Sequence, residues 1–163
     1  MSSGEGLARR MEDVLSRLDD LMKELVEARA TFNKLDALLS ELEMRLEGIR
    51  DMGYPFFSDL DVELKALREG WGEARKNIIS RLAVLEAWAT SASGAVRSLI
   101  SEARMHLRSR SYPAADVEVS RAEEELSELE MRIRPELAGL METMRAFSEK
   151  SKRLGKSIGL IED

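Results

Sequence analysis

An unbroken heptad stripe occupies the first third of the chain. Apolar residues recur in steps of three and four at thirteen successive positions: Leu7, Met11, Val14, Leu18, Leu21, Leu25, Ala28, Phe32, Leu35, Leu39, Leu42, Leu46 and Ile49. A repeat that averages 3.5 residues keeps one seam of an α-helix against a partner and implies left-handed supercoiling. Leu15 and Met22 widen the stripe, which indicates two neighbouring helices. The sequence therefore predicts a long coiled-coil helix.

Two further stripes follow. The second is Leu60, Leu64, Leu67, Trp71, Ala74, Ile78, Leu82, Leu85, Ala89, Ala92, Val96, Leu99 and Ala103, and the third is Ala115, Val119, Ala122, Leu126, Leu129, Ile133, Leu137, Leu140, Met144, Phe147, Leu154 and Ile158. Turn residues at 51–59 and 109–113 separate the stripes. We predict an all-α fold, an elongated antiparallel three-helix bundle with helices at about 5–50, 59–110 and 112–155. One domain would span 1–163, with a frayed C-terminal tail at 156–163.

Two places leave alternatives open. Small residues gather at 89–95, and a break near 90–94 would give four helices instead of three. Pro135 lies inside the third stripe without a capping residue before it, so we predict a kink within one helix. That kink could be a static packing adjustment or a hinge.

Charge gives a test of the second hairpin. Folding it would set a basic segment against an acidic one, namely Arg97, Arg104, Arg108 and Arg110 against Asp116, Glu118, Glu123, Glu124 and Glu125. We therefore predict that this basic patch is neutralised within the chain rather than by an external anion.

Composition excludes several kinds of chemistry. The net charge of −6 disfavours binding to nucleic acid, and the absence of cysteine excludes disulfides and thiolate catalysis. The single histidine, His106, follows Glu102 by four residues, whereas a di-iron bundle needs two Glu-x-x-His motifs. We predict no metal, no cofactor and no enzymatic activity. No signal peptide or membrane span is evident, so we expect a cytoplasmic protein. Proteins of thermophiles contain fewer thermolabile amides, so the absence of glutamine suggests a thermophilic source.

Aromatic residues suggest two candidate partner-binding sites. Tyr54, Phe56 and Phe57 cluster in the first turn, where they could anchor a partner or close the end of the bundle. Trp88 flanks the main seam, where it could mark an interface or pack on Pro135.

The C-terminal segment suggests a third candidate site. It combines basic residues, including Lys150, Lys152, Arg153 and Lys156, with apolar residues at helical spacing. A basic amphipathic helix can bind a partner groove or an anionic lipid surface. Alternatively, this segment completes the third helix against acidic residues of the other two.

Three heptad segments of similar length resemble a spectrin-type repeat, and the resemblance covers nearly the whole chain. It implies a binding or spacer role. We therefore expect a structural or protein-interaction module, such as an adaptor, spacer or assembly subunit, with an unknown protein partner or a second copy of itself. The alternative is a membrane-surface or membrane-remodelling protein that uses the basic C-terminal segment and is similar in outline to BAR-type modules.

Overall fold

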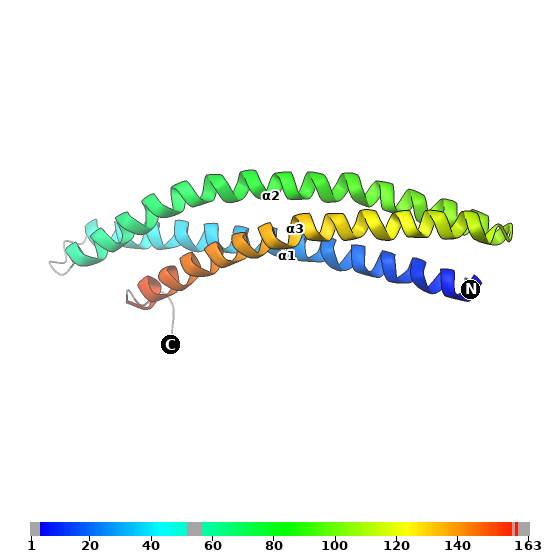
Figure 1. Ribbon diagram of the computed structural model, residues 1–163. Helices are drawn as coiled ribbons and strands as arrows, with labels where there is room; N and C mark the ends of the chain where they lie inside the picture. Colours follow the sequence, from blue (N-terminus) through cyan, green and yellow to red (C-terminus); the bar gives the residue numbers. More distant parts are fainter. Residues whose placement is uncertain (1–3, 52–56, 158, 160–163) are drawn as a thin grey trace. The chain divides into compact units, whose positions relative to one another are not determined.

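The fold is an all-α three-helix bundle, as predicted. The computed structural model describes residues 4–51, 57–157 and 159, with the side chains of residues 57 and 58 left aside. Its helices are α1 (Gly4–Asp51), α2 (Phe57–Arg108) and α3 (Tyr112–Ser157), which follow one another along the chain (Figure 1). Each observed boundary lies within about two residues of its predicted position. The aromatic cluster is not tested, because Tyr54 and Phe56 lie outside the described residues.

The four-helix alternative is wrong, because α2 is continuous through residues 89–95. Alanine is the best helix former, and a single helical glycine such as Gly94 costs only about 1 kcal/mol. Ala89 and Val96 are fully buried on either side of this glycine, so packing offsets that cost. Thr90 also donates its hydroxyl to the Glu86 carbonyl oxygen at 2.8 Å, within the same helix.

Contacts between backbones divide the chain into two compact units. Unit 1 comprises Met1–Val26 and Leu82–Leu137, and unit 2 comprises Glu27–Arg81 and Ala138–Asp163. Each unit therefore contains part of all three helices. Ion pairs reveal the directions within a unit: Arg10 contacts Asp116 and Glu123, and Arg17 contacts Glu130. Because both sets of numbers rise together, α1 and α3 run parallel in unit 1.

Helix α2 runs antiparallel to α1. In unit 2, Arg50 pairs with Asp61, Glu43 pairs with Arg68, and Asp36 pairs with Arg75. The α1 number falls as the α2 number rises, which defines the opposite direction.

The core of unit 1 follows the predicted stripes except at two α2 positions, Ala92 and Leu99, which are only half-buried. It contains the α1 positions from Leu7 to Leu25, the α2 positions Leu82, Leu85, Ala89, Val96, Ile100 and Ala103, and the α3 positions from Ala115 to Leu137. Ile100 is 1% exposed, whereas Leu99, which the heptad predicted, is only half-buried. A four-residue step from Val96 to Ile100 shifts the seam, as a stutter does.

Arg97, one residue of the predicted basic patch, has a partner other than those predicted. Arg97 pairs with Asp19 of α1 at 2.8 Å, and the acidic Asp116 and Glu123 of α3 bind Arg10 of α1. These hydrogen bonds raise the pKa of the Arg10 guanidinium above its ordinary value. Long arginine side chains at the edge of a seam can reach either neighbouring helix, and sequence spacing does not decide which.

The α2–α3 turn is a Schellman motif that has arginine in place of the usual glycine. The Ser111 N–H donates to the His106 carbonyl oxygen at 2.8 Å, and the Arg110 N–H donates to that of Leu107 at 3.1 Å. Arg110 has a φ of 62°, in the left-handed region. The Ser111 carbonyl oxygen then accepts the first bond of α3, from the Ala115 N–H at 3.0 Å.

Helix α3 continues through Pro135, which is exposed. Proline has no N–H, so the Met131 carbonyl oxygen loses its helical donor. The Met131 side chain is 78% exposed, which places this turn of the helix at the solvent, where water can satisfy the carbonyl.

Candidate functional site

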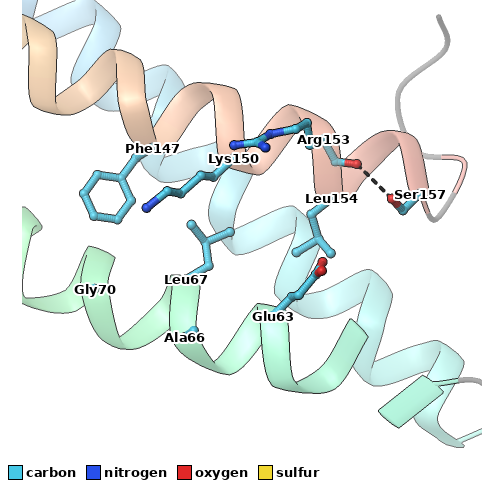
Figure 2. A pocket seen from close by; sticks show the side chains of 9 residues that line it. All are labelled: Glu63, Ala66, Leu67, Gly70, Phe147, Lys150, Arg153, Leu154 and Ser157. Atoms are coloured by element: carbon cyan, nitrogen blue, oxygen red, sulfur yellow. Dashed lines mark hydrogen bonds between the residues drawn. The ribbon is translucent and has the colours of Figure 1, made fainter. Parts of the chain in front are cut away.

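A groove lies between α2 and α3 in unit 2, with a volume of about 560 Å³. Its lining residues are Glu63, Ala66, Leu67 and Gly70 of α2, and Phe147, Lys150, Arg153, Leu154 and Ser157 of α3 (Figure 2). The four α2 positions follow the i, i+3, i+4, i+7 spacing, so they share one face of the helix. The groove is therefore a trench between two helix faces.

The groove exists because α2 has small residues where larger ones would fill the space. Ala66 and Gly70 are exposed at the groove, on either side of the buried Leu67. A Cβ added at Gly70 would lie 3.4 Å from the Phe147 ring. Leu67 and Leu154 are 7% and 4% exposed and form an apolar floor. The surface between the two helices is thus concave, with an apolar base.

Phe147 connects this floor to the aromatic core of unit 2. Its ring packs edge-on against Trp71 with centroids 5.3 Å apart, and Trp71 lies 5.7 Å from the Phe32 ring. The Trp71 indole N–H donates to Asp36 at 3.0 Å, and Arg75 donates to the same oxygen at 2.9 Å. Phe147 therefore rests on a ring held by packing and a hydrogen bond, which gives the groove a fixed floor.

Asp36 is the titrating group of this cluster. Burial alone would raise the pKa of its carboxyl, but the hydrogen bonds from Arg75 and Trp71 outweigh that effect and hold the pKa below its ordinary value. The carboxylate is thus charged at neutral pH and accepts both donors.

The rim of the groove carries two cations that form no ion pair within the described residues. Lys150 and Arg153 are exposed on α3, and the Lys150 ammonium lies 5.7 Å from the Phe147 ring centroid. Figure 2 shows the Lys150 side chain directed toward the Phe147 ring. The Arg153 backbone also forms a hydrogen bond within α3, in which its carbonyl oxygen accepts the Ser157 hydroxyl at 3.0 Å.

A second groove in unit 2, between α1 and α2, makes a useful contrast. It holds about 210 Å³, and its two arginines are paired: Arg75 with Asp36 at 2.9 Å, and Arg68 with Glu43 at 2.6 Å. The pairing also raises the pKa of the Arg68 guanidinium. The two arginines that line the α1–α2 groove are therefore paired with carboxylates, whereas Lys150 and Arg153 have no ion-pair partner in the part of the chain that the structure describes.

The predicted site residues that the structure describes do not come together in one place. Lys150 and Arg153 line the α2–α3 groove, while Lys152 and Lys156 are exposed on α3 outside it. Phe57 begins α2, but its side chain is not among those described. The sequence analysis missed the α2 wall of the groove, although Ala66 and Gly70, four residues apart beside a core leucine, were a usable signal.

Trp88 lies apart from the groove, in unit 1. It is half-buried, and the Arg132 guanidinium lies 5.1 Å from the centre of its ring. Together they border a shallow hollow of about 320 Å³, whose other lining residues are Ser91, Ala92, Ala95, Glu125, Glu128 and Leu129. Trp88 thus already has a cationic partner within the chain.

His106 lies beside a carboxylate across the second hairpin. Its Nδ1 lies 2.7 Å from Glu118 Oε1, which links α2 to α3 beside the Schellman turn. Throughout residues 4–51 and 57–157, histidine and acidic side chains form no group of three that could hold a metal ion.

Comparisons of this chain with known proteins find no related protein. Neither models of known protein families, nor characterised proteins, nor solved structures give a significant match to this chain. In the parts of the chain that the structure describes, no helix has both the length and the apolar character needed to cross a bilayer.

Proposed function

We propose that the chain is a non-enzymatic structural and protein-interaction module, and that the α2–α3 groove of unit 2 is its docking surface. The observation that carries this proposal is the combination in one place of an apolar floor, Leu67 and Leu154, with two cations, Lys150 and Arg153, that have no ion-pair partner among the residues that the structure describes. Apolar contact supplies binding energy, while charged rims supply orientation and specificity.

The architecture fits the same role. A three-helix bundle with heptad packing resembles spectrin-type modules, which suggests an adaptor, spacer or assembly subunit. The trench between two helix faces matches the recognition mode in which an amphipathic helix lays its apolar side into a groove.

A selection experiment tests the proposal. The immobilised protein is used to select binders from a phage library of randomised helical peptides, and binding is then compared in two variants. Gly70→Leu places a side chain in the groove, whereas Gly72→Leu changes a glycine whose added Cβ meets nothing within 4 Å and which does not line this groove.

We expect Gly70→Leu to abolish binding of the selected peptides and Gly72→Leu to preserve it. Both variants exchange a helical glycine for a better helix former, so both should remain folded. If selection yields no binder, or if the binders are insensitive to Gly70→Leu, the groove is not the docking surface.

A further inference from the structure

We infer that the occupant of the α2–α3 groove is an amphipathic helix with acidic residues along one flank. This inference rests on the proposed function and adds the chemistry of the partner. Its starting point is the imbalance of charge on α3: residues 145–157 contain the basic Arg145, Lys150, Lys152, Arg153 and Lys156 and the acidic Glu149 alone. The chain as a whole has a net charge of −6, so this stretch is a local exception.

The dimensions of the trench suit a helix. Its α3 wall runs from Phe147 to Ser157, which at 1.5 Å per residue is about 15 Å, or roughly three helical turns. Opposite this wall, Ala66 and Gly70 leave space above Leu67. One or two large apolar side chains of a partner helix would fill that space and cover the floor.

The charges fix which helix fits. Lys150 and Arg153 are three residues apart on the α3 wall, so acidic residues spaced by three or four on a docked helix could face both. Glu63 lies on the α2 wall, where it disfavours a second acidic flank. A helix acidic on one flank and neutral or basic on the other therefore docks in one orientation.

A concave trench also favours a helix over a bilayer. Leu67 and Leu154 lie at the base, between two walls, and are at least nine-tenths buried. A flat lipid surface would meet the cationic rims without reaching these leucines, whereas a helix covers both.

The built-in fluorophore gives a direct assay. The chain has two tryptophans, so a Trp88→Phe variant leaves Trp71 as the sole one, in contact with Phe147 at the groove floor. Three synthetic peptides of about five helical turns share one leucine stripe and carry glutamate, glutamine or lysine along the same flank. Binding is followed by Trp71 emission and by calorimetry, at low and at high salt.

We expect the glutamate peptide to bind about tenfold more tightly than the glutamine peptide, since two exposed ion pairs each add a modest amount. High salt should reduce that preference. In the Lys150→Glu/Arg153→Glu variant the lysine peptide should become the best ligand. A Lys152→Glu/Lys156→Glu variant has the same net charge but leaves the groove unchanged, and it should retain the glutamate preference.

The outcomes separate the two proposals. Equal affinity for the three peptides, with all binding lost in Gly70→Leu, would refute the acidic helix and retain the groove as a docking surface. Failure of every peptide to bind in a Gly70-dependent way would refute both. Groove-dependent binding to vesicles of equal phosphatidylserine and phosphatidylcholine in preference to the peptides would assign the basic rim to lipid. Self-association that Gly70→Leu abolishes, seen by light scattering, would assign the groove to a second copy.

Discussion

Removal of the Asp36 carboxylate should destabilise unit 2 mainly because the buried indole N–H of Trp71 loses its hydrogen-bond acceptor. The loss of the ion pair at the surface should matter less. Trp71 is 5% exposed, and its indole N–H has Asp36 as its hydrogen-bond acceptor. Asp36→Ala leaves that N–H buried without an acceptor, which costs about 1–3 kcal/mol. The ion pair to Arg75 contributes less, about 0.5 kcal/mol, because the two side chains are 30% and 44% exposed.

The expected loss of unfolding free energy in Asp36→Ala is therefore about 2 kcal/mol, which for a chain of this size lowers Tm by about 4–8 °C. Asp36→Asn keeps an oxygen that can accept from Trp71 and should lose only about 1 kcal/mol. Arg75→Ala removes the ion pair alone and should lose about 0.5 kcal/mol.

Urea unfolding of each variant in the Trp88→Phe background, followed by Trp71 emission, measures these changes in unfolding free energy with a probe that lies in unit 2. Glu41→Ala, an exposed change on the same helix, serves as the control and should stay within about 0.5 kcal/mol of the parent. A loss in Asp36→Ala no larger than that in Arg75→Ala would refute the reasoning, because it would mean that the indole hydrogen bond contributes nothing.

The same carboxylate makes part of the stability depend on pH. Its folded pKa lies below the unfolded value, so its contribution is present above about pH 4 and is lost as the pH falls through the folded pKa. The difference in stability between the parent and Asp36→Asn should therefore shrink as the pH is lowered below about 4. A difference that stays constant from neutral pH to pH 2 would contradict this assignment.

Three further predictions concern the helices. Arg110→Gly should raise stability by about 1 kcal/mol in thermal unfolding, because glycine adopts a φ of 62° without strain, whereas Arg108→Gly, at the end of α2, should give no gain. Ile100→Ala should lower the unfolding free energy by about 3 kcal/mol and Leu99→Ala by about 1 kcal/mol, since only Ile100 is fully buried. Equal losses would contradict the shift of the seam from Leu99 to Ile100. Gly94→Ala should stabilise α2 by about 1 kcal/mol, as its added Cβ meets nothing, and a loss of stability would reveal an unseen contact.

Heptad spacing predicted most of the fold because burial follows periodicity over long helices. All the α1 stripe positions from Leu7 to Leu46 are buried, and the α2–α3 turn falls within the predicted interruption at 109–113. The prediction failed at Leu99, where two neighbouring apolar residues competed for one seam position. Sequence alone could not choose between them, since the choice depends on how the seam shifts at a stutter.

The candidate site was half predictable. Lys150 and Arg153 were recognised from the basic amphipathic pattern of the C-terminal segment, and both line the groove. The distinction between these two and Lys152 or Lys156 depends on how α3 is rotated against α2, which the helical period does not fix. Ser151 was also missed, because the third stripe contains only apolar residues: it is fully buried, and its hydroxyl donates to the Phe147 carbonyl oxygen at 2.6 Å.

The division of the chain into units has a consequence for biosynthesis. Neither unit is contiguous in sequence, since Glu27–Arg81 of unit 2 is separated from Ala138–Asp163 by the greater part of unit 1. During synthesis on the ribosome, the α2 wall of the groove emerges long before the α3 wall. Leu67 and Trp71 therefore stay uncovered until Phe147 and Leu154 have been made. A nascent chain therefore exposes Leu67 and Trp71 before Leu154, Lys150 and Arg153 are made, and the complete groove forms only after the third helix is synthesised.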